Sequence, residues 1–505
     1  MMRTYIFILI QLLFISTIRS QAKLDFKAVD ELTGKYFKEQ KWDSIIRVGN
    51  NALRQNIDYY YLRVRMGISY FEKQKYLPAA FSLEKARSLN SGDSLITYYL
   101  YRSYIYSNHD DEARSVRDKI PKDNRDTKST GNGFLEQAHL EGGYTLSNDR
   151  SSVSIPDLTG TFKAKSDNDY YSEQDLYGNT WYGNLELKMR IFKRLSLSLS
   201  YNYLSLDKST YIMDGHFQDR FMGTSDSGGV KRIYHYSYPW VTRDTSFHYR
   251  ITQHEGHLGI NVALPAGFKI QPAIHLIYVA YTMTNLNFRA NTINDTSSYS
   301  YSSKKYTYHP FTHYNYAFFQ KDTSFYNYVI SLLVTKDIKI FNIGLSLSWS
   351  NLNNLTQEQA GLMLTYYPLG NLDFYGTTAA TGFLQGNESR ILLSQVLGTK
   401  VTRWWWLEGN FYWGNYSNTN IFNGAVVYNN SDKIDYHAGA SLIFIAGKHI
   451  QLSLIYQYLS EESPLLYDIK RPSPGQGPLK INEQPQITYI PYNTNNIIGG
   501  ITWKL

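Results

Sequence analysis

Residues 195–203 read LSLSLSYNY, so that Leu or Tyr alternates with Ser or Asn along the whole stretch. Because successive side chains of a β-strand point to opposite faces, this alternation predicts a strand with one apolar and one polar face. Residues 341–349 (FNIGLSLSW) and 436–444 (YHAGASLIF) repeat the pattern. Two-faced strands of this kind occur in soluble β-sandwiches as well as in membrane β-barrels.

Other features of these strands favour a barrel in a membrane. They run for about ten residues or more, and their polar faces are rich in Ser, Asn, Gly and Gln, which suit a wet interior. Tyr and Trp gather at the strand ends, where outer-membrane barrels carry aromatic girdles. We expect the girdle to include Tyr366, Tyr367, Trp404, Trp405, Trp406 and Trp503.

The spacing of turns predicts an antiparallel transmembrane barrel of about 14 strands over residues 134–505. Short turns on the periplasmic side alternate with longer connections, of which 207–245, 285–320 and 461–493 are the longest. Since an unpaired sheet edge is costly in hydrocarbon, the first strand should pair with the last. The expected strands are 134–147, 178–191, 195–206, 246–263, 268–284, 323–335, 340–351, 356–367, 372–383, 389–400, 404–416, 434–445, 450–460 and 494–505.

One of the long connections, residues 299–319, is unusually rich in Tyr. Exposed aromatic faces can stack on sugars or bind other proteins. The simpler interpretation, and the one that we expect, is a β-hairpin that continues the barrel above the membrane.

Alternation also predicts which charged side chains point into the barrel. On the second strand Leu185, Leu187 and Met189 should face lipid, which leaves the intervening charges inside. These charges could select solutes at a constriction, but mutual pairing is favoured because an unpaired buried charge is expensive. The expected lumen-lining residues are His139, Glu141, Glu186, Lys188, Arg190, Glu255, His257, Arg390 and Glu408.

Residues 1–22 have the order of parts of a secretory signal peptide. Arg3 precedes an almost wholly apolar stretch at 5–15, and small or polar residues follow up to Ala22. We therefore expect the protein to leave the cytoplasm. The chain has no Cys, which excludes disulfides, thiolate metal sites and Cys nucleophiles.

Residues 23–120 carry helical spacing and repeat with a period of 34, as between Tyr36, Tyr70 and Tyr104. A period of 34 is typical of tetratricopeptide helix pairs, and the unit from Tyr60 to Ser91 resembles that family most. The resemblance implies a periplasmic domain that docks a partner protein. Residues 121–133 are expected to be a linker. The expected packing residues are Tyr36, Tyr70, Tyr104, Ala52, Ala79, Ala86 and Ala113.

Composition narrows the function further. The 505 residues carry a formal charge of +8 without a block of five or six like charges, so nucleic-acid binding has little support. Phosphate-binding and dinucleotide-binding motifs are missing, and we expect no cofactor, no metal and no enzymatic activity. A Ser246–His248 pair on one strand face is of a kind that arises by chance, so an outer-membrane hydrolase is the least favoured function.

We therefore expect an α+β chain, with a short helical repeat domain followed by an outer-membrane barrel. Its Tyr-rich strands resemble the outer-membrane barrels of Bacteroidetes-type bacteria, and the order of its parts resembles exporters of exopolysaccharide. These resemblances imply envelope transport, export or assembly. The implied partners are outer-membrane lipid, a periplasmic protein, and a solute or polysaccharide. The alternative is a passive pore, or a surface adhesin or scaffold.

Overall fold

The computed structural model describes residues 24–120, 133–148, 170–227, 230–300, 305–467 and 486–505. The expected signal peptide and almost all of the expected linker lie outside these residues. The chain divides into two compact units, Met1–Arg125 and Asp126–Leu505. Only the backbone is described at 170–172, 212–227, 230–246, 285–300, 305–318, 467 and 486.

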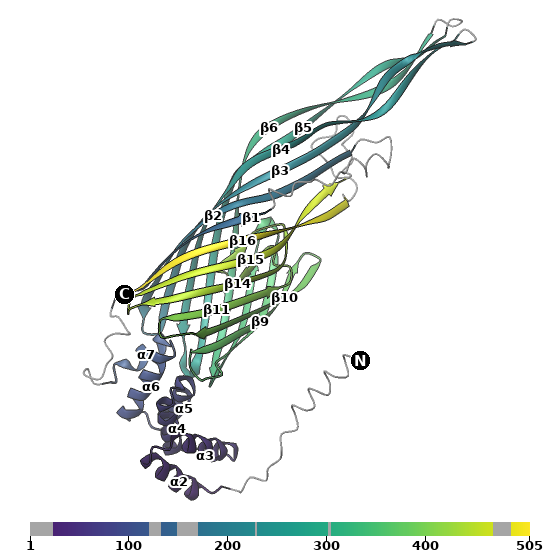
Figure 1. Ribbon diagram of the computed structural model, residues 1–505. Helices are drawn as coiled ribbons and strands as arrows, with labels where there is room; N and C mark the ends of the chain where they lie inside the picture. The colour runs from purple at the N-terminus through teal and green to yellow at the C-terminus, as the bar shows by residue number, and fades with distance from the viewer. Residues whose placement is uncertain (1–23, 121–132, 149–169, 228–229, 301–304, 468–485) are drawn as a thin grey trace, which may run out of the picture. The chain divides into compact units, whose positions relative to one another are not determined.

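The first unit consists of helices that follow one another in pairs (Figure 1). Each pair turns at a residue in the left-handed conformation: Gln40 (φ 53°), Gln74 (φ 58°) or Asn108 (φ 59°). The period of 34 therefore recurs in the backbone. None of the described helices is long and apolar enough to cross a membrane. They are α2 (Phe26–Lys38), α3 (Trp42–Arg54), α4 (Tyr60–Glu72), α5 (Tyr76–Leu89), α6 (Ser94–Tyr106) and α7 (Asp110–Arg117).

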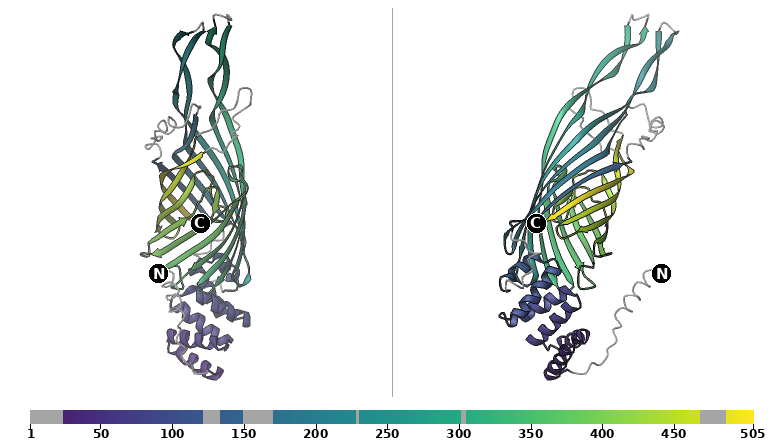
Figure 2. Two further views of the ribbon diagram at one scale, coloured as in Figure 1. Left: turned by 90° about the vertical axis from the view of Figure 1, so that its right-hand side faces the viewer. Right: turned by 60° about the vertical axis from the view of Figure 1, so that its left-hand side comes forward.

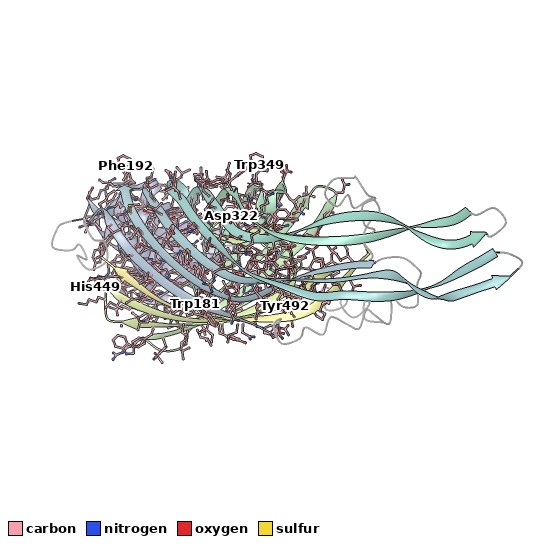
Figure 3. All side chains as sticks on the ribbon, turned by 90° about the horizontal axis from the view of Figure 1, so that it is seen from above. Trp181, Phe192, Asp322, Trp349, His449 and Tyr492 are labelled. Atoms are coloured by element: carbon pink, nitrogen blue, oxygen red, sulfur yellow. The ribbon has the colours of Figure 1, made fainter. Side chains whose placement is uncertain are left out.

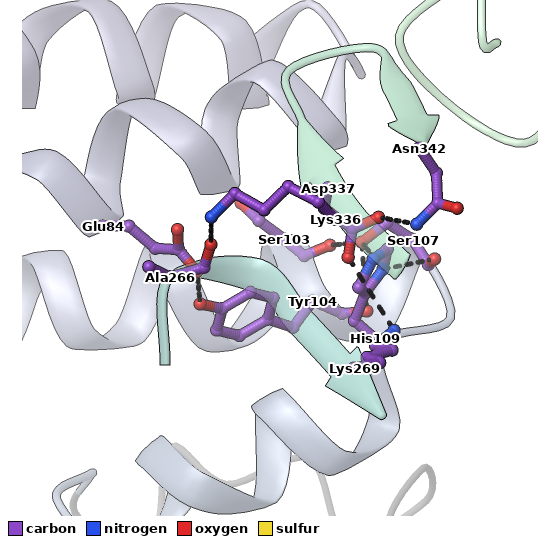
Figure 4. A network of polar contacts seen from close by, with 10 residues as sticks. All are labelled: Glu84, Ser103, Tyr104, Ser107, His109, Ala266, Lys269, Lys336, Asp337 and Asn342. Carbon is purple, nitrogen blue, oxygen red and sulfur yellow. Dashed lines mark hydrogen bonds and ion pairs between the residues drawn. The ribbon is translucent and has the colours of Figure 1, made fainter. Parts of the chain in front are cut away.

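Small residues allow these helices to pack closely. At Gly67 an added Cβ would lie 2.5 Å from Cγ of Leu83, so only glycine fits between α4 and α5. The Tyr104 hydroxyl donates a hydrogen bond to Glu84 on α5 (Figure 4). Of the residues expected to pack, Ala52, Ala79, Ala86 and Ala113 are fully buried, Tyr104 is buried, and Tyr36 and Tyr70 are half-buried.

Asp93 caps the N-terminus of α6. Its Oδ1 accepts hydrogen bonds from the backbone N–H groups of Leu95 (2.8 Å) and Ile96 (3.3 Å), and its Oδ2 accepts one from the Tyr60 hydroxyl (2.6 Å). The Tyr60 bond, aided by the two amides, holds the pKa of Asp93 below its ordinary value although burial opposes this. We expect Asp93→Ala to destabilise α6 by about 1 kcal/mol, measured by amide hydrogen exchange of α6 at neutral pH.

The pH dependence of this effect has a defined sign. Because folding lowers the pKa of Asp93, its stabilisation is present above the unfolded pKa of about 3.9 and disappears as the pH falls through the folded pKa. The difference between wild type and Asp93→Ala should therefore shrink in acid. Asp25→Ala, which removes the cap of α2, is the matched control and should loosen α2 alone. Unchanged exchange of α6 in Asp93→Ala at neutral pH would contradict the prediction.

The second unit is a closed antiparallel β-barrel (Figure 1). Its described residues form 14 wall strands. A helical segment followed along the chain by a closed antiparallel barrel confirms the expected fold class. β1 pairs with β16 from Gln137–Lys504 to Ser147–Thr494, so the first strand closes on the last. In ring order the strands are β1 (Leu135–Ser147), β2 (Tyr170–Phe192), β3 (Leu195–Ser227), β4 (Val230–Ala263), β5 (Phe268–Ser300), β6 (Lys305–Ile338), β7 (Phe341–Ser350), β8 (Gln357–Tyr366), β9 (Phe374–Gln385), β10 (Glu388–Lys400), β11 (Trp405–Trp413), β14 (Lys433–Ala446), β15 (Ile450–Tyr467) and β16 (Gln486–Lys504).

The barrel wall is much taller on one side. Strands β3 to β6 have 33 or 34 residues each, whereas β7 and β8 have 10. About 9–11 residues suffice for a strand to cross a bilayer, so most of each tall strand extends beyond it. The hairpins β3–β4 and β5–β6 separate beyond Ile251, and their tips meet again where Val230–Arg232 pairs with Ser298–Ser300 (Figure 2).

These hairpins correct the expected loops. Residues 207–245 and 285–320 were expected as connections, but their described backbone is mostly paired strand. The hairpin expected around 299–319 is confirmed at the level of the backbone, while nearly all of its side chains lie outside the described residues. The reason is that strands outside the hydrocarbon need no apolar face, so pairing continues where the period of two ends.

The two faces of the wall differ in chemistry. On β7 the five apolar side chains from Phe341 to Trp349 are 42 to 47% exposed and alternate with small polar residues. Figure 3 shows Phe192 and Trp349 on the outside of the barrel. An apolar outer face on a closed ring of hydrogen bonds meets the requirement for crossing a membrane. The chain therefore carries a β-barrel of the outer-membrane type.

Candidate functional site

Residues 414–432, between β11 and β14, fold into the barrel and are called the inner loop. Their two short strands, β12 (Thr419–Ile421) and β13 (Val426–Tyr428), form a hairpin. Thr419 and Asp432 are 0% exposed. Glycine and asparagine tolerate the left-handed conformations that these tight turns need. Positive φ angles occur at Gly414, Asn418, Phe422, Asn423 and Gly424.

The tip of the inner loop reaches the opposite wall of the barrel. Asn423 Nδ2 donates a hydrogen bond to the Gln271 carbonyl on β5 (2.8 Å), and Ser331 Oγ on β6 donates to the Asn423 carbonyl (2.7 Å). His275 Nδ1 on β5 lies 2.7 Å from the Gly424 carbonyl. Strands β7 to β10 lie between β6 and β11 in the ring, so the loop spans the lumen.

Further polar contacts follow the loop along the wall between these points. Asn420 Nδ2 donates to Ser348 Oγ on β7 (3.0 Å), and Asn418 Nδ2 donates to Gln385 Oε1 on β9 (3.2 Å). Arg390 on β10 donates to the Ser417 carbonyl. Most of these bonds join neutral groups, each of which contributes only about 0.5–1.5 kcal/mol net.

The base of the inner loop is held differently, by apolar and aromatic contacts. Tyr416 is 3% exposed and packs in a cluster with Tyr412 and Ile434, against which Tyr428 is also packed. Tyr412 stacks on the imidazole of His437 with ring centroids 4.5 Å apart. The loop therefore has an apolar base and a largely polar tip, from which Val427 packs against the wall cluster around Ile277 and Val329.

A histidine beneath the tip links two of the expected lumen residues. His275 is 0% exposed. Its Nε2 lies within ion-pair distance, 3.1 Å, of Oε2 of Glu255. The two ring nitrogens of His275 therefore each lie beside an acceptor oxygen, the Gly424 carbonyl on one side and the Glu255 carboxylate on the other. Asn202 Nδ2 also donates to Glu255 (2.9 Å). The ring of His257 lies 5.5 Å from that of His275. Sequence reasoning singled out Glu255 and His257 but missed His275.

Two other expected lumen residues also pair within the wall. Arg390 forms an ion pair with Glu388 (2.7 Å) and lies 3.7 Å from the ring centre of Phe383. Glu408 Oε2 accepts a hydrogen bond from the Tyr375 hydroxyl at 2.5 Å. Arg390 thus joins the inner-loop site, whereas the contact described for Glu408 is to the wall.

The remaining expected lumen residues lie on β1 and β2. His139 Nδ1 is 2.8 Å from Thr502 Oγ1, and its Nε2 is 3.2 Å from Glu141 Oε2. Arg190 donates to the Gly133 carbonyl at 2.5 Å. Glu186 and Lys188 occupy alternate positions of β2, across from His139 and Gln137 on β1. The structure does not bring this group to the inner loop.

The expected aromatic girdle is only partly on the outside. Trp405 and Trp503 are 39% and 57% exposed, whereas Trp406 shares the inner face with Glu408 and its Nε1 is buried. Tyr367 packs toward Tyr375 on the same inner face. Neighbouring residues of a strand point to opposite faces, so runs such as 366–367 and 404–406 cannot lie wholly in a girdle. Tyr366 lies on the outer face, and Trp404 is exposed in the turn before β11.

The inner loop was not foreseen from the sequence. Its composition offers a signal, because residues 414–432 contain six Asn and two Gly. Their apolar residues are too few to form the outer face of a wall strand. Side-chain amides can replace the hydrogen bonds that a buried backbone loses with water. An Asn-rich connection in a barrel is therefore a candidate for an inward fold.

The Ser246–His248 pair noted in the sequence lies on β4. The side chain of Ser246 lies outside the described residues, and His248 Nδ1 lies 2.6 Å from Ser209 Oγ instead. Within the described part of the chain, no group of three or more His, Cys, Asp or Glu side chains could hold a metal ion.

Comparison with known proteins gives a likeness of fold. No protein-family model and no curated protein matches the chain. It is similar to a Pseudomonas aeruginosa FadL homologue (10% identity, 75% of this chain and 91% of that one, TM-score 0.41). It is also similar to the Pseudomonas putida toluene transporter TodX (7%, 74% and 89%, 0.36) and to the Escherichia coli outer membrane protease OmpT (7%, 74% and 97%, 0.20). At these identities the likeness is one of barrel architecture alone.

Proposed function

We propose that the protein is an outer-membrane channel for polar solutes and that the inner loop is its gate. The observation that carries the proposal is the loop's construction, with an aromatic base around Tyr416 and a tip held by polar contacts at Asn420, Asn423 and Gly424. Water can replace neutral hydrogen bonds at little net cost, but it cannot replace apolar packing. The tip is therefore free to leave the wall while the base stays anchored.

The wall that the tip would uncover is suited to polar solutes. The inner positions of β7 are Gly344, Ser346, Ser348 and Ser350, and the loop-facing row continues with Ser331 on β6. Such a surface binds water as readily as it binds the loop. The sequence-based alternative of a scaffold or adhesin corresponds instead to a lumen closed by side chains.

A disulfide tether tests the gate. Ser348 Oγ and Asn420 Nδ2 lie 3.0 Å apart, and the natural chain has no Cys that could compete. We expect the oxidised Ser348→Cys/Asn420→Cys variant to lose at least nine-tenths (~1.4 kcal/mol or more) of the open-channel events of the wild type in planar bilayers. Reduction should restore them.

The single variant Ser348→Cys, treated in the same way, controls for the substitution and the reagents. Equal conductance of the oxidised and reduced double variant, with the wild type conducting, would show that the solute passes beside a fixed loop. A wild type that stays closed under every condition would instead support a filled barrel that acts as a scaffold.

We further propose that the helical unit is a periplasmic domain that docks a partner protein. Its surface exposes apolar side chains that the unit does not cover, including Tyr61 (61% exposed) and Leu95 (52%). Crosslinking from these positions in cells would identify the partner.

A further inference from the structure

The outer face of the short strands carries a groove of about 1230 Å³. Pockets for small ligands typically measure about 300–1,000 Å³, so the groove is large enough for one. Strand register arranges the outward residues that line it in rows across β6 to β10. The row at the long-loop end holds Ile330, Trp349, Glu358, Leu384 and Ser389, and the next holds Leu332, Leu347, Ala360, Gly382 and Ile391.

The hollow arises from two small residues set between large ones. Ala360 and Gly382 are paired across β8 and β9, and Leu347 and Ile391 rise on either side with 45% and 67% of their surfaces exposed. A Cβ added to Gly382 would meet only the Ala360 carbonyl, at 3.8 Å. The floor of the groove is thus open to a ligand.

The groove and the inner loop share a stretch of wall. Between the two outward rows runs a third row, which includes Ser331, Ser348 and Arg390; these residues also line the groove, while their side chains bond the inner loop. The outward rows continue the apolar band that faces the membrane. The groove therefore opens toward lipid.

One charged side chain stands at the end of this apolar groove. Glu358 is exposed on the outer face, directly after the first residue of β8, and its cross-strand neighbours are Trp349 and Leu384. Its carboxylate has no hydrogen bond or ion pair to any other described residue. A carboxylate at the rim above an apolar trough matches an amphiphile with a cationic head and an acyl tail.

We infer that the groove binds a membrane lipid whose headgroup carries a primary amine. The acyl chain lies over Ala360 and Gly382, and the ammonium group donates to the Glu358 carboxylate. Charge-assisted hydrogen bonds of this kind are about twice as strong as neutral ones, which gives the site its preference for an amine. The inference does not depend on whether the inner loop is a gate.

Native mass spectrometry of the full chain in detergent tests the site. The probes are phosphatidylethanolamine, phosphatidylcholine and phosphatidylglycerol with identical acyl chains. We expect the wild type to retain one phosphatidylethanolamine about tenfold more tightly than either other lipid, and Glu358→Gln to remove this preference. Gly382→Leu, which fills the trough, should abolish retention of all three.

Gly499→Leu is the matched control, because Gly499 is also an exposed strand glycine with open space at its Cβ, but lies on β16. Ala360→Leu is a second groove-filling variant in case Gly382→Leu does not fold. Equal lipid retention by the groove variants and the control would show annular lipid only and would overturn the inference. An unchanged preference in Glu358→Gln would overturn it as well.

Discussion

Replacing residues 420–427 by Gly-Gly is expected to convert the barrel into a steadily open channel. Thr419 and Tyr428 are directly paired across the hairpin, so two glycines can close the shortened turn. The change removes the contacts of Asn420, Asn423 and Gly424 and leaves the aromatic base in place. We expect single-channel conductance in planar bilayers to rise by about tenfold or more relative to the wild type, as wide barrels leave an aqueous path.

A control of equal length distinguishes two effects of the loop: its bulk, which blocks the lumen, and its side-chain contacts, which hold it to the wall. Residues 420–427 replaced by eight Gly and Ser residues keep the bulk of the loop but lose its side-chain contacts. We expect this variant to flicker between closed and open levels. If the shortened loop conducts no more than the wild type, other side chains fill the barrel and the gate proposal fails.

Replacing His275 by Leu is expected to cause the largest loss of stability. The imidazole is fully buried between the Gly424 carbonyl and the Glu255 carboxylate, which is itself 8% exposed. Removing one partner of a buried ion pair leaves the other charge uncompensated and costs about 3–5 kcal/mol. The measurement is the urea concentration at which the barrel unfolds, followed by its altered mobility in unheated SDS gels.

The double variant His275→Leu/Glu255→Leu is the matched test of that cause. Apolar replacement of both members of a buried pair is often neutral, so the double variant should regain much of the lost stability. A double variant less stable than His275→Leu would mean that Glu255 stabilises the wall through Asn202 and Gln253 rather than through the pair.

The fold was largely readable from sequence because the membrane imposes a period of two. Stretches such as 195–203 and 341–349 show it plainly, and each of the expected strands overlaps a wall strand of the structure. The strand ends were wrong where this constraint stops. Along 207–245 and 285–320 the strands continue into water, where hydrogen bonding persists but no apolar face is required.

The candidate site was harder to predict, because it depends on side chains that meet only after the barrel closes. Glu255 and Arg390 were expected inside from alternation alone, and both now lie at the inner loop. The loop itself carries no period. His275 follows the same alternation, but it was missed because it is the only residue of the apolar run 272–280 that can ionise near neutral pH.

The seam between β1 and β16 bears on how the protein is made. His139 and Thr502, which touch across it, are 363 residues apart in the chain. Contacts so distant in sequence form slowly, because a very long segment must first lose its freedom. The ring therefore stays unsealed until β16 is available to pair with β1. During that interval the inner loop can enter the interior sideways, and sealing of the seam then completes the wall around it.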